Sequence, residues 1–548
     1  MNILYAPTFG QQGDYPVYEG DDLGIRWSPE RTVLRVWAPS ADALVWHLYG
    51  DDLGDSRLTS VPMQRDTQGT WVAAIEGDQQ GRYYTVQARF GDRWSAEVPD
   101  PWVRATGANG LRGMIFDPAD TRPEEWSADQ RPPLDQFEDI IIYELHLRDI
   151  SVHPASGIRH KGKFLGLAET GTTTPAGTPT GLDHIADLGV THVHILPMFD
   201  FASLDETRPE PGYNWGYDPQ NYNVPEGTYA TDPHDGRVRM REMKTMVQAL
   251  HRKGLRVIMD VVYNHMFDAA RSSFEQLVPG YFFRHDADGS YSNASGCGNE
   301  TASERPMMRK FIVESVRYWA TEYHIDGFRF DLMAIHDLET MRAVRQALDQ
   351  IDPTIFVYGE GWTAGASPLP DSLRALKANI PRLPGIAAFS DEVRDAIKGH
   401  VFTHDDPGFA SGKPGLKESI KFGLVAAGDH PEVDYASVNY SRDPWTLDPA
   451  QCIVYASCHD NHTLWDRLAL SRPDQPEAVR QRMQMLALTI VLTSQGVPFL
   501  HAGSEMLRTK YGVENSFESP DTINQIDWLR LERYPEVHQY VRALIALR

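Results

Sequence analysis

The sequence has 548 residues, too many for one ordinary hydrophobic core, so we expect at least two domains. A hydrophobic content of 41%, with 10% aromatic residues, excludes a disordered chain. The formal net charge of −24 argues against nucleic acid and anionic membranes as partners, because both require a positive protein surface.

The first residues, Met1-Asn-Ile-Leu-Tyr5, lack the basic start and the apolar core of a signal peptide. No apolar run in the sequence is long enough to span a membrane. The three cysteines, Cys297, Cys452 and Cys458, form no Cys-x-x-Cys pair, so we expect neither a disulfide framework nor a cysteine zinc site. These features together predict a cytoplasmic protein.

Residues 1–125 are predicted to form an all-β sandwich domain. Four segments alternate apolar and polar residues with a period of two and are separated by turn-forming residues: 32–37, 43–49, 70–75 and 83–90. Short strands at this spacing are typical of an antiparallel sandwich. A polar, proline-rich stretch at 120–133 then indicates a linker.

Residues 126–548 are predicted to form a catalytic (β/α)8 TIM barrel, an α/β fold. Apolar runs alternate with helical periodicity in about eight units. The predicted strands are 140–146, 190–197, 255–262, 325–331, 354–360, 386–389, 452–457 and 497–501. The predicted helices are 181–188, 240–253, 307–323, 338–350 and 536–547. The run before Asp391 is short and is equally compatible with a loop.

Polar residues stand where four of these predicted strands end. They are Asp260 with Asn264 and His265, Arg329 with Asp331, Glu360, and His459 with Asp460. The carboxyl ends of barrel strands form the active-site rim. One such Asp alone would more simply be a helix N-cap or a turn residue. Four endings in strand order favour a shared site.

Three carboxylates and an arginine at one rim suit cleavage of a glycosidic bond. In a retaining mechanism one carboxylate attacks the anomeric carbon and a second, roughly 5 Å away, protonates the leaving oxygen. Asp331 and Glu360 end the predicted neighbouring strands four and five, so we predict that they form this pair. Burial and an ionised Asp331 would keep Glu360 protonated near neutral pH. Spacing alone assigns no role to Asp460.

The segments at these strand ends resemble the four conserved regions of the α-amylase superfamily, glycoside hydrolase family 13. They read DVVYNH at 260–265, GFRFD at 327–331, YGEG at 358–361 and CHDN at 458–461. The resemblance implies that Asp331 is the nucleophile and Glu360 the general acid/base. It also implies that Asp460 binds sugar hydroxyls and favours the distorted, oxocarbenium-like ring.

By the same resemblance, three neighbouring side chains prepare subsite −1. Arg329 would orient the nucleophile, and His265 and His459 would bind the sugar. These assignments follow from the family's pattern and not from the spacing in this sequence.

A second motif, YNWGYDP at residues 213–219, resembles the signature of the type I pullulanases. Taken alone it is a Gly- and Pro-bounded loop with three aromatic residues and one carboxylate, and a purely structural turn is an equal alternative. The resemblance implies that Tyr217 stacks under the sugar at subsite −1. It implies that Trp215 and Asp218 help to shape that end of the cleft.

Other segments also look pullulanase-like: 224–229, 296–305 and 461–466. On this basis Trp362 and Trp465 are candidate substrate platforms, and Asp466 is a candidate substrate-binding residue. Either tryptophan could instead pack inside the barrel rim.

The predicted sandwich resembles the family 48 carbohydrate-binding module that precedes such barrels, and we expect it to act mainly as a packed structural partner. The family continues past its barrel into a C-terminal β-sandwich. Because the eighth helix is predicted at the end of this sequence, we expect no such domain in it. The resemblance requires no cofactor or metal and leaves a structural calcium ion open.

The predicted function is retaining hydrolysis of α-1,6-glucosidic branch linkages in pullulan, glycogen, amylopectin and limit dextrins. The expected partner is therefore an α-glucan, with no nucleic acid and no membrane; the oligomeric state stays open. A glucan-branching transferase, or a hydrolase of mixed α-1,4/α-1,6 activity, is the alternative, and the motif at 213–219 argues against the transferase. A non-catalytic glucan-binding protein is a third hypothesis, which the presence of Asp331, Glu360 and Asp460 together disfavours.

Overall fold

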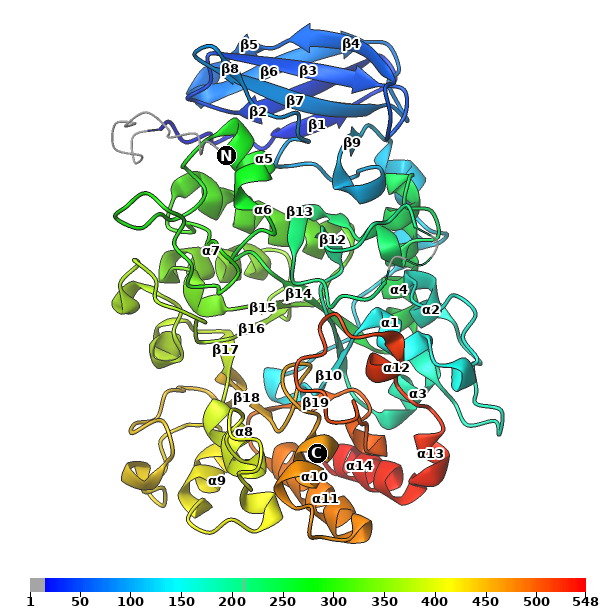
Figure 1. Cartoon of the computed structure of the whole chain (residues 1–548), viewed down its shortest axis with the longest axis vertical. Coiled ribbons are helices and arrows are strands. Elements are labelled where there is room, and N and C mark those ends of the chain that lie inside the picture. Colours follow the sequence, from blue (N-terminus) through cyan, green and yellow to red (C-terminus); the bar gives the residue numbers. More distant parts are fainter. Residues whose placement is uncertain (1–14, 209, 211) are drawn as a thin grey trace.

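A sandwich of two antiparallel sheets stands on one side of a larger α/β barrel in the computed structural model (Figure 1). The structure describes residues 15–208, 210 and 212–548. The beginning of the predicted sandwich domain, including Met1 to Tyr5, lies outside the described residues.

The sandwich contains the four strands that the period-two alternation predicts. One sheet has the order β1 (Gly24–Trp27), β2 (Arg31–Trp37), β6 (Thr70–Glu76), β5 (Gln64–Arg65). The other has β4 (Arg57–Pro62), β3 (Ala43–Tyr49), β7 (Tyr83–Phe90) and β8 (Arg93–Trp94), and β9 (Gly113–Met114) also pairs with β7. Leu34 and Val36 in β2 are buried while Val33 and Arg35 are partly exposed, so the alternation sends one side of the strand into the core.

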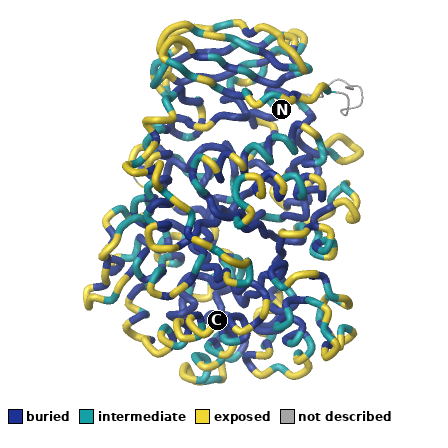
Figure 2. Tube along the Cα trace, turned by 180° about the vertical axis from the view of Figure 1, so that it is seen from behind, coloured by how far each residue is buried: buried dark blue, intermediate teal, exposed yellow. Residues whose placement is uncertain are grey.

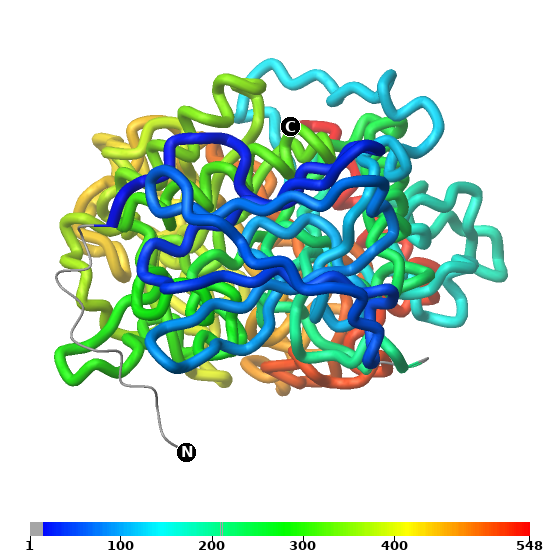
Figure 3. The backbone as a smooth tube through the Cα atoms, turned by 90° about the horizontal axis from the view of Figure 1, so that it is seen from above, coloured from blue at the N-terminus to red at the C-terminus, as the bar shows by residue number. Residues whose placement is uncertain are grey.

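Aromatic side chains join the sandwich to the barrel. Trp37, at the end of β2, is 1% exposed and meets the rings of Tyr281 (centroids 4.9 Å apart) and Phe282 edge-on. Trp102 packs edge-on against Phe311, and its indole nitrogen donates to a carboxylate of the same barrel helix. Seen from above, the strands of the sandwich cross over the barrel (Figure 3). The two modules therefore share one continuous apolar core.

The barrel is closed by eight parallel strands. In spatial order they are β10 (Ile142–Leu145), β11 (His192–Ile195), β14 (Arg256–Val261), β15 (Gly327–Phe330), β16 (Phe356–Gly359), β17 (Ile386–Phe389), β18 (Cys452–Tyr455) and β19 (Val497–His501). Every residue of these strands is buried, because the outer face is covered by helices and the inner face fills the barrel. The predicted fold class is confirmed, and the short run before Asp391 is a strand and not a loop.

Helices surround the barrel, and several begin at a side chain that accepts a backbone N–H. Asp337 caps α7, Ser390 caps α8 and Thr463 caps α10 in this way. The helices are α1 (Leu147–Ser151), α2 (Phe164–Ala168), α3 (Gly181–Leu188), α4 (Gly236–Arg252), α5 (Ser273–Leu277), α6 (Pro306–Glu322), α7 (Leu338–Asp349), α8 (Asp391–Lys398), α9 (Lys417–Leu424), α10 (Leu464–Ser471), α11 (Glu477–Thr493), α12 (Asp521–Asn524), α13 (Arg530–Arg533) and α14 (Pro535–Leu547). Buried residues fill the interior and exposed residues follow the outer turns (Figure 2). None of the helices in the described part of the chain has the length and apolar character needed to cross a bilayer.

One antiparallel hairpin interrupts the strand–helix alternation after the second barrel strand. It consists of β12 (Phe199–Phe201) and β13 (Pro219–Pro225). The segment that joins these two strands contains the loop 213–219. Pro219, the last residue of that loop, is the first residue of β13, so the hairpin fixes this end of the loop.

Candidate active site

One guanidinium group, that of Arg329, joins three carboxylates from three adjacent strands. Its Nη1 lies 3.0 Å from Oδ1 of Asp260 and 2.8 Å from Oδ1 of Asp331, and its Nη2 lies 2.9 Å from Oε1 of Glu360. Asp260 and Arg329 are paired in register on β14 and β15. Asp331 and Glu360 directly follow β15 and β16. The structure therefore brings together the two residues that strand order predicts as a pair.

The carboxyl group of Glu360 is suited to hold a proton. Burial raises its pKa to about 7. Arg329 opposes this rise, whereas the negative charges of Asp331 and Asp460 add to it. One oxygen, Oε2, accepts the backbone N–H of Leu332 at 2.8 Å. Near neutral pH a substantial share of Glu360 is consequently a neutral acid.

Both carboxylate oxygens of Asp331 are held by the protein. Oδ1 accepts from Arg329, and Oδ2 accepts from Nδ2 of Asn264 at 2.8 Å. The next residue, Leu332, has φ 40°, a left-handed conformation that is rare for a side chain of this kind. This turn directs the Leu332 N–H toward Glu360, so the backbone after one carboxylate positions the other.

A second charged pair crosses from the first strand to the seventh. Oε1 of Glu144, in β10, lies 2.6 Å from Nδ1 of His459, which follows β18. Burial tends to lower the pKa of His459, but the carboxylates of Asp460 and Glu144 outweigh burial and raise it to about 9. The imidazole is therefore positively charged at neutral pH. Its Nε2 lies 3.6 Å from Oδ1 of Asp460, whose side chain is 49% exposed.

Sequence reasoning missed Glu144 and its neighbour His194. Glu144 lies within the predicted strand 140–146 and His194 within the predicted strand 190–197. An ionisable residue inside an apolar run was the signal that could have marked each of them as a site residue. Nε2 of His194 lies 2.9 Å from Oδ2 of Asp260. Burial acts to raise the pKa of Asp260, but Arg329 and His194 overcome it and hold the value at about 2. Asp260 is thus a permanent anion beneath the site.

Tyr217 connects the loop 213–219 to these charges. Its hydroxyl donates to Oδ2 of Asp260 at 2.8 Å, and its ring lies stacked on that of His459, with centroids 5.0 Å apart. Trp215 is 4% exposed and meets His459 edge-on at 4.9 Å. Tyr217 therefore lies within the site, whereas Trp215 supports His459 from behind.

His265 lies beside this loop, near Asp218 within it. His265 is 1% exposed, with Nδ1 2.6 Å from Oδ1 of Asn264 and Nε2 3.0 Å from the carbonyl oxygen of Tyr217. Both ring nitrogens thus face protein oxygens, and burial lowers the pKa of this histidine despite the opposing charges of Asp331 and Asp218. The structure gives His265 a supporting position in addition to the sugar contact predicted for it.

The two candidate platforms differ. Trp362, just after Glu360, is half-buried and lies 6.4 Å from the ring of Phe389 at the barrel mouth. Trp465 is 8% exposed and belongs to a cluster under α14 with Leu507, Tyr534 and Val537. This burial agrees with the alternative given for Trp465, that it packs inside the rim, and its role as a substrate platform stays a prediction.

Asp466 is likewise enclosed by the protein. Its Oδ1 accepts from the hydroxyl of Thr509 at 2.5 Å, and its Oδ2 accepts from the backbone N–H of Lys510 at 2.7 Å. With both oxygens engaged and 6% exposure, Asp466 anchors the loop that follows the eighth strand. The substrate contact expected of Asp466 stays a prediction.

Two groups of described side chains have ligand atoms close enough for one metal ion. In the first, Asp200, Glu206 and Glu226 surround Arg239 and are all buried. Burial, and next the charge of Glu206, raise the pKa of Asp200 to about 7. The negative charge of the three carboxyl groups is therefore balanced by a bound proton and by Arg239. The second group consists of His404, His462 and Glu514, at the rim near Asp460.

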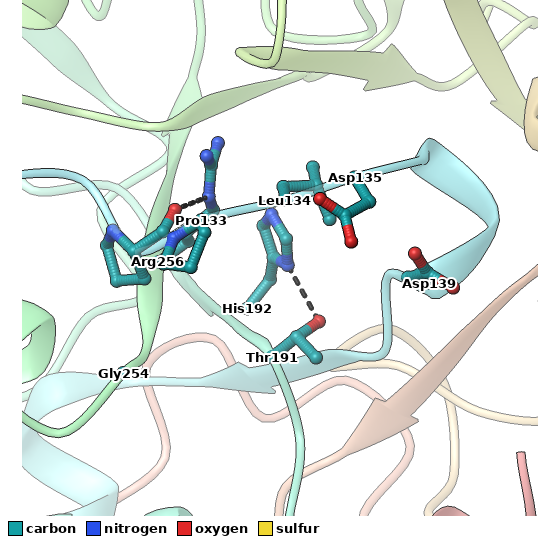
Figure 4. A pocket seen from close by; sticks show the side chains of 9 residues that line it. Pro133, Leu134, Asp135, Asp139, Thr191, His192, Gly254 and Arg256 are labelled. Carbon is teal, nitrogen blue, oxygen red and sulfur yellow. Dashed lines mark hydrogen bonds between the residues drawn. The ribbon is translucent and has the colours of Figure 1, made fainter.

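A pocket of about 200 Å³ lies at the opposite end of the barrel (Figure 4). His192 and Arg256, the first residues of β11 and β14, line it, and Nε of Arg256 donates to the carbonyl of Pro132 at 2.7 Å. Burial lowers the pKa of His192 to about 3, so this ring is uncharged at neutral pH. Residues at the amino ends of barrel strands serve stability, and the chemistry belongs to the other rim.

Known proteins with these features are carbohydrate-active. Residues 165–294 match the family model "Alpha amylase, catalytic domain", and residues 22–103 match "Carbohydrate-binding module 48 (Isoamylase N-terminal domain)". The chain is 42% identical over 535 residues to a pullulanase of Bacillus subtilis, covering 98% of this chain and 72% of that protein. It is 31% identical to the chloroplastic pullulanase 1 of Arabidopsis thaliana, covering 93% of this chain and 61% of that protein.

Solved structures agree with this likeness. A crystal structure of a pullulanase from Paenibacillus barengoltzii, in complex with maltohexaose and α-cyclodextrin, superposes with a TM-score of 0.94 at 50% identity. The match covers 98% of this chain and 82% of that one. A pullulanase from Anoxybacillus sp. LM18-11, complexed with maltotetraose, matches with a TM-score of 0.91 at 43% identity, over 98% of this chain and 75% of that one.

Proposed function

This chain belongs to the pullulanases of the α-amylase superfamily, glycoside hydrolase family 13, and on that premise we propose that it is a debranching enzyme. It hydrolyses α-1,6-glucosidic branch linkages in α-glucans. The observation that carries the proposal is the junction at Arg329, where an anchored carboxylate and a carboxyl group with a pKa of about 7 share one cation.

The first step forms a glycosyl-enzyme ester. An oxygen of Asp331 attacks the anomeric carbon of the glucose on the non-reducing side, and the bond from that carbon to the O6 oxygen breaks. Glu360 delivers its proton to the leaving O6, which departs as a hydroxyl group. The share of neutral Glu360 near pH 7 supports this role.

The second step restores the enzyme. Glu360, now a carboxylate, takes a proton from water as the water oxygen attacks the same carbon and displaces Asp331. Two inversions give a product with the α configuration of the substrate. All proton movements use Glu360, so this chemistry requires no cofactor.

The surrounding charges stabilise the cationic transition state. We assign Asp460, the most exposed of the strand-end acids, to the sugar hydroxyls and Arg329 to the orientation of Asp331. Tyr217 and the charged His459 form a stacked pair that would bound the sugar at subsite −1. Trp362 would extend the binding surface along the rim.

The linkage is tested by the products released from pullulan. An enzyme that cuts α-1,6 bonds releases maltotriose, whereas α-1,4 cutting yields panose or isopanose. We expect maltotriose as the main product by chromatography, with linear amylose almost untouched. Panose as the main product would overturn the assignment.

The mechanism is tested by two aspartate variants. Asp331→Ala should lose activity by roughly 10⁴-fold or more, because no other side chain can form the ester. Asp474→Ala is the matched control, since this aspartate is 62% exposed on an outer turn, and it should retain wild-type activity. Pullulan cleavage by Asp331→Ala at the wild-type rate would refute the mechanism.

A further inference from the structure

Three barrel loops bring two imidazoles and a carboxylate together at the rim of the cleft. His404 follows α8, His462 follows β18, and Glu514 follows β19. One potential ligand atom from each lies within 4.8 Å of the others. Nε2 of His404 is 3.1 Å from Oε2 of Glu514, and the ring of His404 meets that of His462 edge-on at 4.8 Å.

His462 is the member that ordinary packing does not explain. It is 4% exposed, yet its ring engages in no hydrogen bond with any residue of the ranges 15–208, 210 and 212–548. Its ring nitrogens are thus not committed to described protein partners. A neutral imidazole offers a lone pair on one ring nitrogen, which is the atom that binds a metal ion.

We propose that His404, His462 and Glu514 bind a divalent transition-metal ion of the Zn²⁺ class. Two neutral imidazoles and one carboxylate are a ligand set that Zn²⁺ prefers, with the fourth tetrahedral position left for water. Ca²⁺ and Mg²⁺ favour sets made of oxygen atoms, so they are poor occupants. The proposal uses no residue of the catalytic junction and stands apart from the proposed hydrolysis.

The ion would cross-link three loops that are far apart in the sequence. His404 and Glu514 have side chains that are 47% and 32% exposed, so an ion can enter from solvent. His462 lies two residues after Asp460, and the ion therefore ties the loops together at the edge of the cleft. Binding only to the folded chain would also raise its melting temperature.

The test is calorimetric titration of the metal-stripped full chain with ZnCl₂ at pH 7.5, without glucan. We expect one equivalent to bind to the wild type. His404→Ala should weaken this binding at least tenfold, and Glu514→Gln, which keeps the size of the side chain, should weaken it as well. His400→Ala, a second exposed histidine of the same loop, is the matched control and should bind as the wild type does.

Melting curves complete the test. We expect ZnCl₂ to raise the melting temperature of the wild type and of His400→Ala by several degrees, and to have no such effect on His404→Ala. Any effect of CaCl₂ should be equal in all of these proteins. Zinc affinity that is unchanged in both His404→Ala and Glu514→Gln, with native melting temperatures of the stripped variants, would overturn the proposal.

Discussion

The two reacting carboxyl groups share the guanidinium of Arg329 but differ in their other surroundings. Asp331 has a further donor, Asn264, whereas Glu360 is more deeply buried and receives one backbone N–H. Donors and solvent favour the anion, and burial favours the neutral acid. The same cation therefore neighbours a nucleophile held by two side-chain donors and a proton donor whose pKa is raised by burial.

The pH dependence of activity follows from the pKa of Glu360. The donor must be protonated, so kcat/KM for pullulan should fall above about pH 7 and approach a tenfold loss per pH unit. Initial rates at low pullulan concentration, measured from pH 4 to 10, give the profile. An alkaline limb that begins only above pH 9 would contradict this assignment of the proton donor.

The raised pKa of Glu360 also affects stability. The unfolded carboxyl ionises near pH 4.5 and the folded one near pH 7, so the stability that its raised pKa provides is present at low pH and is lost as the pH rises to about 7. Glu360→Gln cannot ionise. The variant should therefore gain stability relative to the wild type between pH 4.5 and 7, by on the order of a few kcal/mol.

This second prediction is checked by urea unfolding at several pH values. The difference between variant and wild type should grow over this range and then stay constant above it. A difference independent of pH would mean that Glu360 titrates alike in both states.

The loop 213–219 acts as one element, because its aromatic residues pack against the charged histidine of another strand. Trp215 and Tyr217 contact His459 on edge and face, respectively. The hydroxyl of Tyr217 also completes the set of donors around Asp260. The loop thus contributes side chains to the site and also holds the charged groups of His459 and Asp260 in place.

Tyr217→Phe isolates that hydroxyl and keeps the stacked ring. Loss of a hydrogen bond to a buried carboxylate costs about 1.5–3 kcal/mol, so we expect kcat to fall by roughly 10–100-fold with a smaller change in KM. Steady-state kinetics on pullulan measure the split. Tyr511→Phe, whose ring is 65% exposed, is the control, and an equal effect in both variants would refute the role of the Tyr217 hydroxyl.

The elements were predictable where their environment is simple. Barrel strands are buried on both faces, so they appear as apolar runs, and all eight were predicted. α11 was missed because its last two turns are apolar nearly all round and show no 3.6-residue period. The hairpin β12–β13 was missed because its strands pair across a long loop that carries the aromatic motif.

The site was predictable where a polar residue ends a strand, and less so where it lies within one. Asp331 and Glu360 end strands, whereas Glu144 is inside an apolar run. Its role becomes visible only in the structure, where it contacts His459 across the barrel. The sequence left two roles open for Trp465, because an aromatic side chain serves a sugar platform and a hydrophobic core equally well. Only the packing under α14 distinguishes the two.

At the scale of the molecule, we expect the sandwich and the barrel to unfold as one unit, because aromatic residues of the two pack against each other. Trp37 is the clearest case, because this last residue of β2 is buried against the barrel segment that carries Tyr281. Trp37→Ala should destabilise the whole chain by about 3–5 kcal/mol and lower a single melting transition. Trp94→Ala, at a ring 47% exposed on the far strand β8, should change it little.

Differential scanning calorimetry, with activity after heating, distinguishes the outcomes. A separate early transition of the sandwich in Trp37→Ala, with the barrel melting as before, would show that the modules unfold independently. Coincident loss of structure and pullulan cleavage is the expected result.

The strand ends described above carry more negative than positive groups. Glu144, Asp260, Asp331, Glu360 and Asp460 surround Arg329 and the protonated His459, and His194 also contacts Asp260. The excess of negative charge at the carboxyl end of the barrel should therefore attract a cation of the size of a glucose ring. Protonated iminosugars should accordingly inhibit pullulan cleavage more strongly than neutral sugars of the same shape. Added salt should weaken the inhibition by the iminosugars and leave that by the neutral sugars unchanged. Amine buffers are for this reason a poor medium in which to measure this enzyme.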